Sequence, residues 1–168
     1  MAGVATAALE VLMELPEAEV LIVPVGGGSG AAGASLVAKA LAPNARVIGV
    51  QSEGAPAAFR SWRSGQVVEE HEVRTFAEGL ATRVGFELPQ RMIRERLDDF
   101  VLVSDAEILA AMGLILRGAH LVAEAAGAAA TAAALRLGSA LAGKKVVCWL
   151  SGGNAEMPFL EKAIAQKA

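Results

Sequence analysis

Residues 20–30 read VLIVPVGGGSG, six apolar residues followed by five positions of which four are glycine. The apolar part, residues 20–25, shows no alternation of polar and apolar side chains, which is typical of a strand buried on both faces of a parallel sheet. The stretch after the glycines, residues 31–41, is rich in alanine and favours a helix. The sequence therefore predicts a strand, a glycine turn and a helix in direct succession.

The same alternation continues along the chain. Further apolar runs favour buried strands at residues 47–50, 100–103 and 146–150. Helical stretches are expected at residues 31–41, 89–97, 105–117, 123–137 and 157–166. Residues 104–107, SDAE, form a capping box that marks one helix start. This pattern predicts a single α/β domain over residues 1–168, an open, mostly parallel sheet with helices on both faces, whose ligands bind beyond the carboxyl ends of the strands.

The composition excludes several functions. Hydrophobic residues make up 54% of the 168 residues, enough for a sizeable core. A net charge of -3 and an aromatic content of 4% predict no nucleic-acid surface. The single cysteine, Cys148, excludes an internal disulfide and, with an N-terminus unlike a signal peptide, indicates a cytoplasmic protein. The alanine-rich residues 123–134 are too few to cross a membrane, so we expect a buried helix there.

The glycine loop at residues 26–30 predicts an anion site. Glycines allow unusual backbone angles and remove side chains, so that amide N–H groups can face a ligand directly. The helix that follows adds the positive end of its dipole, and a phosphate is the most natural occupant. A tight turn without a ligand is the alternative, although an ordinary turn rarely needs so many glycines.

A dinucleotide is a second candidate ligand for this loop. Residues Gly28, Gly30 and Gly33 match the G-x-G-x-x-G fingerprint. Glu53 lies about 20 residues further on, where a ribose-binding acid is expected in an NAD(P)-binding Rossmann-type domain. No Gly-Lys-Ser/Thr follows the glycines, so the loop is not a P-loop.

A second glycine turn follows the last predicted strand. Residues 146–150 lead into Ser151-Gly152-Gly153-Asn154, at the edge of the sheet where the first loop also opens. This turn offers a hydroxyl and an amide rather than another phosphate cradle. The pair of loops predicts a flat ligand with a phosphate at one end and a polar ring atom at the other, whereas a dinucleotide does not predict the second loop.

Six segments in order carry a resemblance to a known family. Residues 2–10, 23–30, 75–80, 98–108, 124–128 and 150–154 are similar to motifs that read AGQGT, VPVGGGG, TIADGI, DDIVLVSDEEI, EPAGA and LSGGN. These motifs belong to the C-terminal half of the threonine dehydratase (threonine/serine ammonia-lyase) and serine racemase family, pyridoxal-phosphate enzymes of the tryptophan-synthase-β fold. By this resemblance, residues 1–168 correspond to most of the large cofactor-binding domain.

The resemblance implies roles for individual residues. The cofactor phosphate would be held by the backbone N–H groups of Gly26, Gly27, Gly28, Ser29 and Gly30. The Ser151 hydroxyl would bond the pyridine nitrogen, and Gly79 would present its backbone to the reactive edge of the cofactor. Glu124 would line the pocket near the ring, unless its charge only stabilises a helix start. A neutral hydroxyl leaves the ring a weaker electron sink, which suits the β-elimination of water from a hydroxy-amino acid to give a 2-oxo acid and ammonia.

The chain departs from the family by what it lacks. The S-x-K-x-R-G motif of the Schiff-base lysine and the S-x-G-N-H loop for the substrate carboxylate belong to the family's upstream half, and neither occurs here. We therefore expect an absent lysine-bearing half and an inactive isolated chain. We also expect homo-oligomers, and no catalytic role for Lys39, Lys144, Lys145, Lys162 or Lys167. A non-catalytic remnant that packs against a partner chain is the remaining alternative.

The sequence predicts no metal site. Some relatives bind a divalent cation after the second strand through two acids, but Gln51 and Ala57 occupy the matching positions, and hard cations need several oxygen ligands. His71 and His120 have no ligand spacing to each other or to Cys148, and we expect both at the surface.

Overall fold

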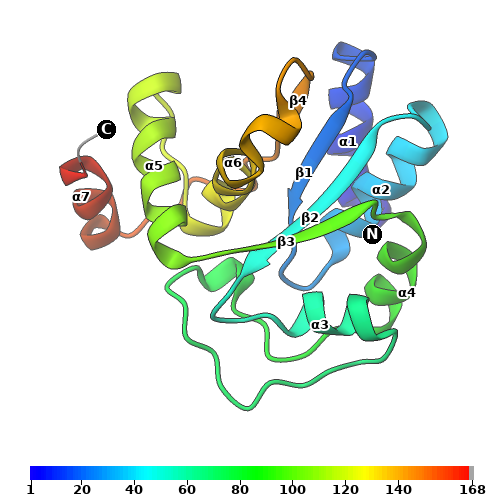
Figure 1. The fold of residues 1–168 in the computed structure, drawn as a ribbon, viewed down its shortest axis with the longest axis horizontal. Coiled ribbons are helices and arrows are strands. Elements are labelled where there is room, and N and C mark those ends of the chain that lie inside the picture. Colours follow the sequence, from blue (N-terminus) through cyan, green and yellow to red (C-terminus); the bar gives the residue numbers. More distant parts are fainter. Residues whose placement is uncertain (167–168) are drawn as a thin grey trace.

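Four parallel strands form the centre of the structure, a computed structural model that describes residues 1–166 (Figure 1). The strands are β1 (Val20–Pro24), β2 (Arg46–Ser52), β3 (Asp99–Val103) and β4 (Val146–Cys148), in the spatial order β3-β2-β1-β4. All three neighbouring pairs are parallel. The predicted parallel sheet is therefore confirmed, whereas Lys167 lies outside the described residues.

Within residues 1–166, seven α-helices surround the sheet, and two short 3-10 helices, η1 and η2, lie in the connections between α3 and α4 and between α6 and β4. The α-helices are α1 (Ala2–Glu14), α2 (Ser29–Leu41), α3 (Ala57–Ser64), α4 (Glu87–Arg96), α5 (Asp105–Ala119), α6 (Ala125–Leu137) and α7 (Met157–Ala165), and the 3-10 helices are η1 (Glu78–Leu80) and η2 (Gly138–Leu141). Helices α1, α2 and α4 cover one face of the sheet and α5 and α6 cover the other (Figure 1).

The two faces of β1 explain why its sequence does not alternate. Leu21 and Val23 point into the core beneath α1, α2 and α4, whereas Val20 and Ile22 point into the core beneath α5 and α6. Each of these side chains is at most 1% exposed, and burying one contributes about 1.5–3 kcal/mol to stability. A strand covered on both sides thus needs apolar residues at every position.

The strand order creates a switch point beside β1. The chain steps from β1 to β2 and then to β3 in one direction, and β4 returns to the other side of β1. The register pairs Ile22 with Cys148, and the N–H of Trp149 still donates to the carbonyl oxygen of Ile22 at 3.0 Å. The loops that follow β1 and β4 therefore open at the same edge of the sheet, where ligands of such folds bind.

The carboxyl ends of β2 and β4 each differ from the prediction by two residues. β2 continues to Ser52 because its buried polar side chains find partners: Gln51 Oε1 accepts from the N–H of Phe59 at 3.0 Å, and Ser52 Oγ accepts from the N–H of Gly54 at 3.1 Å. β4 is shorter than expected and ends at Cys148. The sequence also did not predict α3, which begins after Pro56 without a side-chain cap.

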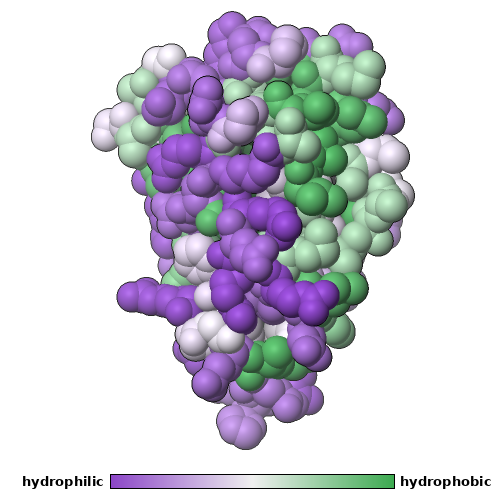
Figure 2. Space-filling view, turned by 90° about the vertical axis from the view of Figure 1, so that its right-hand side faces the viewer, coloured by the Kyte–Doolittle hydropathy of each residue, from purple (hydrophilic) through white to green (hydrophobic). Residues whose placement is uncertain are grey.

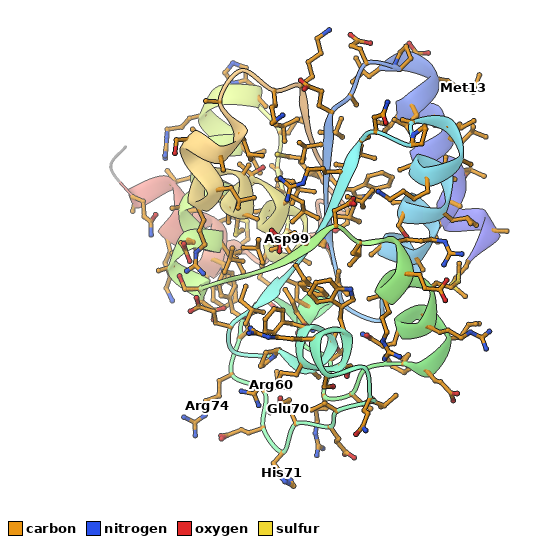
Figure 3. All side chains as sticks on the ribbon, turned by 45° about the vertical axis from the view of Figure 1, so that its right-hand side comes forward. Met13, Arg60, Glu70, His71, Arg74 and Asp99 are labelled. Carbon is orange, nitrogen blue, oxygen red and sulfur yellow. The ribbon has the colours of Figure 1, made fainter. Side chains whose placement is uncertain are left out.

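Several smaller expectations are confirmed. Ser104 caps α5 in a complete capping box with Glu107, and the alanine-rich stretch forms the largely buried α6. His71 and His120 are exposed, and His71 lies at the tip of the long segment between α3 and η1 (Figure 3). Within residues 1–166, the longest apolar helices fall short of what a membrane crossing requires.

Candidate functional site

The glycine loop leaves a set of backbone donors free at the start of α2. Gly28 caps this helix with a left-handed backbone, φ 86°, and offers no side-chain acceptor. The first helical bond runs from the N–H of Ala32 to the carbonyl oxygen of Gly28 at 2.9 Å. Within residues 1–166, the N–H groups of residues 26–31 have no hydrogen-bond acceptor. Free donors at the amino end of a helix are suited to an anion.

Glycine is required at two positions of this loop. A methyl group on Gly26 would overlap the carbonyl oxygen of Gly79, so the two backbones touch. A methyl group on Gly28 would lie 2.8 Å from Cβ of Pro89, and the positive φ of Gly28 adds strain for any other residue. A methyl group on Gly30, in contrast, would meet nothing within 4 Å. The loop therefore packs tightly against the protein at Gly26 and Gly28. It is open at Gly30, at the amino end of α2.

The turn after β4 is fixed on the start of α6. The N–H of Glu124 donates to the carbonyl oxygen of Gly152 at 3.0 Å. A methyl group on Gly152 would lie 2.6 Å from the Glu124 carboxyl carbon, and one on Gly127 would lie 2.6 Å from the Gly152 carbonyl oxygen. These approaches bring Glu124 beside the turn of residues 151–154, while Ser151 itself remains exposed.

Gly79 links the two loops. Its own added methyl group would lie 2.7 Å from Cβ of Ala126 and 3.8 Å from Glu124 Oε1. Thr82 Oγ1, three residues later, donates to the carbonyl oxygen of Gly26 at 3.4 Å. The structure therefore brings Gly26, Gly79, Glu124 and the turn after β4 into one continuous set of contacts, although they come from four distant parts of the sequence.

A cavity of about 240 Å³ adjoins this set. Gly79 and Glu124 line it, together with the apolar side chains of Met112 and Phe159. Neither the glycine loop nor Ser151 contributes to its lining, so the cavity lies beside the glycine loop rather than within it. The sequence predicted Gly79 and Glu124 for the site but not Met112 and Phe159, because only the docking of η1 and α7 onto α5 and α6 brings these residues together.

The lysines of the described residues lie away from the glycine loop. Lys39 is near the end of α2, and Lys144 and Lys145 come directly before β4, so all three lie toward the amino ends of the strands. Lys162, on α7, has its Nζ 5.3 Å from the ring centre of Phe159. No lysine among residues 1–166 belongs to the loop that would hold the phosphate.

The acids near the end of β2 serve other contacts. Arg136 Nη2 lies 2.9 Å from Glu53 Oε1, and Arg136 Nε lies 2.7 Å from Glu107 Oε1. Burial tends to raise the pKa of Glu107, but hydrogen bonds from Arg136 and Ser104 outweigh it and hold that pKa below its usual value. Within residues 1–166, no three His, Cys, Asp or Glu side chains are grouped to hold a metal.

Comparison with known proteins identifies a family for this arrangement. The family model described as pyridoxal-phosphate dependent enzyme matches residues 1–152. L-threonine ammonia-lyase of Thermotoga maritima is 37% identical over 164 residues, which cover 98% of this chain and 41% of that protein.

Two solved structures have the same fold. Threonine deaminase isoform 2 of Solanum lycopersicum matches with a TM-score of 0.90 and 31% identity, over 96% of this chain and 45% of that one. Maize serine racemase matches with a TM-score of 0.84 and 29% identity, over 96% of this chain and 52% of that one. The chain thus spans about half or less of the length of these relatives.

These matches confirm the resemblance drawn from the six segments, and they show that the dinucleotide alternative is wrong. The structure supplies the physical reason. A methyl group on Gly33 would lie 3.0 Å from Cα of Ala5, so this glycine allows α1 to pack on α2. The Glu53 carboxylate forms an ion pair with Arg136.

Proposed function

This chain belongs to the pyridoxal-phosphate-dependent enzymes, and from that premise we propose that it forms the cofactor-holding part of a threonine/serine ammonia-lyase. The observation that carries the proposal is the pair of loops at the switch point of the sheet. One loop offers free backbone donors at the start of α2, and the other offers the Ser151 hydroxyl after the neighbouring strand β4. Residues 1–168 then make up most of the large cofactor-binding domain.

The glycine loop holds the phosphate in this proposal. The N–H groups of Gly26, Gly27, Gly28, Ser29 and Gly30 donate to the phosphate oxygens, and the dipole of α2 stabilises their negative charge. Positions 26 and 28 have no room for a side chain, so glycine at both positions lets the backbone keep this shape and its donors stay free. The Ser29 hydroxyl is exposed beside them and adds one donor.

The ring is held by groups on the opposite side of the switch point. Ser151 bonds the pyridine nitrogen through its hydroxyl, Gly79 faces the reactive edge with its backbone, and Glu124 lines the adjoining cavity. When bound, pyridoxal phosphate supplies an electron sink for removal of the α-proton and the β-hydroxyl of the amino acid. A neutral partner such as Ser151 cannot keep the pyridine nitrogen protonated, which favours elimination over transamination.

The catalytic lysine and the loop for the substrate carboxylate belong to a further part of the protein in this proposal. None of the lysines of this sequence lies in an S-x-K-x-R-G motif. In this proposal the isolated chain is therefore inactive, and the substrate, a hydroxy-amino acid, is turned over only by the complete enzyme. The protein is cytoplasmic and forms homo-oligomers. Exposed apolar side chains favour such contacts, and Figure 2 shows an apolar area beside a hydrophilic band on the side of α1, α2 and α4.

Calorimetric titration of the 168-residue chain tests the proposal. The probe is pyridoxine 5'-phosphate, which lacks the aldehyde and so cannot react with surface lysines. We expect saturable binding at one site, weaker binding of unphosphorylated pyridoxine, and none of NAD. Binding of NAD at one site, or no binding of pyridoxine 5'-phosphate, would contradict the proposal. In the second case the chain would be a remnant that only packs against a partner.

A further inference from the structure

The segment that carries Gly79 into the site, residues 75–82, is held at both ends; we refer to it as the Gly79 segment. At its carboxyl end, Thr82 Oγ1 donates to the carbonyl oxygen of Gly26 at 3.4 Å and accepts from Gln51 Nε2 at 3.3 Å. This end is therefore attached directly to the glycine loop and to the buried end of β2.

At the other end, the carboxylate of Asp105 gathers several donors. Thr75 Oγ1 donates to Asp105 Oδ1 at 2.5 Å, and the N–H of Phe76 donates to Asp105 Oδ2 at 3.2 Å. Ser52 Oγ also donates to Asp105 Oδ1, at 3.3 Å, which ties the carboxylate to β2. Thr75 Oγ1 in turn accepts from the N–H of Ala77 at 3.1 Å. Both carboxylate oxygens are thus committed, and hydrogen bonds to a charged group are the stronger kind.

The position of Asp105 in the fold suits this task. It is the first residue of α5, where the helix dipole favours a negative charge, and the capping box fixes the helix start around it. The 3-10 helix η1 begins two residues after Phe76, and the N–H of Glu78 donates to the carbonyl oxygen of Phe76 at 3.0 Å. A shift at Phe76 is therefore passed on to Gly79, whose carbonyl oxygen touches Gly26.

We infer that Asp105 is a positioning residue of the cofactor site: its carboxylate fixes the start of the Gly79 segment and so sets where Gly79 meets the glycine loop. The inference rests on the proposed function for its meaning, but its geometry concerns only the residues of this chain. Asp105 belongs neither to the glycine loop nor to the cavity lining, and it acts through Thr75 and Phe76, of which Phe76 lines the cavity.

The test compares Asp105→Ala with Glu107→Ala. Glu107 lies in the same first turn of α5, and its carboxylate serves the capping box and Arg136 but not the Gly79 segment. A purely structural role for Asp105, as a charge at a helix start, predicts the same behaviour for both variants. The first measurement is native-state amide hydrogen exchange at residues 76–80 without any ligand, and the second is the dissociation constant of pyridoxine 5'-phosphate.

We expect Asp105→Ala to speed amide exchange at residues 76–80 by about tenfold or more, as the loss of charged hydrogen bonds implies. The dissociation constant of pyridoxine 5'-phosphate should rise to a similar degree. Glu107→Ala should leave both quantities near those of the unmodified chain after correction for global stability. Asp105→Glu should restore part of each. Equal exchange in the Asp105 and Glu107 variants would overturn the inference. If the unmodified chain binds no pyridoxine 5'-phosphate, the proposed function fails, and the exchange measurement still decides the role of Asp105.

Discussion

The substitution Ser29→Glu separates the fold of the glycine loop from its capacity to bind phosphate. Ser29 is exposed and is the first residue of α2, directly after the left-handed Gly28. A negative side chain at this position interacts favourably with the helix dipole, so we expect the free energy of unfolding to rise by about 0.3–1 kcal/mol. The same charge stands beside the donors that the phosphate needs, so ligand affinity should fall while stability does not.

The size of the effect follows from the charges. For a carboxylate roughly 5 Å from a doubly charged phosphate, repulsion amounts to about 2 kcal/mol in bulk water and about 7 kcal/mol at an effective dielectric constant of 20. Even the lower figure weakens binding by more than about tenfold. The matched variant Ser29→Gln has the same length without the charge, and it should cost only the hydroxyl hydrogen bond, about 1 kcal/mol.

Calorimetry with pyridoxine 5'-phosphate and urea unfolding measure the two quantities on the same samples. Because the repulsion acts at the surface, the difference in affinity between the Glu and Gln variants should shrink as salt is added. Equal affinities of the two variants at low salt would refute the assignment of the phosphate to the start of α2, since a carboxylate there could not then be close to the ligand.

Three further outcomes are expected. Gly26→Ala should lower the free energy of unfolding by about 2 kcal/mol or more, because its methyl group meets the Gly79 carbonyl oxygen, whereas Gly30→Ala should be neutral or stabilising in the same urea titration. Because the pKa of Glu107 is lowered in the folded state, its contribution is present above the usual carboxyl pKa and is lost as pH falls through the folded pKa. Urea titrations between about pH 6 and about pH 3 measure how the free energy of unfolding falls with pH. This fall should be less steep in Glu107→Gln than in the unmodified chain, and an equal pH dependence would contradict the assignment. Borohydride reduction after addition of pyridoxal phosphate should give only partial, scattered lysine labelling by mass spectrometry, and full labelling of one lysine would show that this chain carries the Schiff-base residue.

The sequence predicted the central strands well, because a strand that is buried on both faces has apolar residues at every position. Residues 20–25 are apolar throughout, and the capping box at Ser104 needs only local residues. The end of β2 was predicted less well, since Gln51 and Ser52 are polar and stay buried only because Phe59 and Gly54 supply partners. Helix α3 was not predicted, because its eight residues, Ala57–Ser64, are too few to show a clear helical pattern.

The site was predictable only where a motif is contiguous. The glycine loop and the turn at residues 151–154 are each visible as short runs, and the parallel sheet places them at one edge. The hydrogen bond that attaches the Gly79 segment to Asp105 comes from Thr75, 30 positions earlier in the sequence. No periodicity in the sequence indicates such a pair. The same holds for the cavity lined by Met112 and Phe159, which the fold assembles from separate helices.

The place of β4 has a consequence for how the molecule is held together. β4 is a three-residue edge strand, and within residues 1–166 it pairs only with β1. A ligand that contacts both the glycine loop and Ser151 bridges this short strand to the rest of the sheet, and its binding free energy then opposes detachment of the edge. Such a ligand would hold this edge strand on the sheet, and only a chain with β4 in place would retain the ligand.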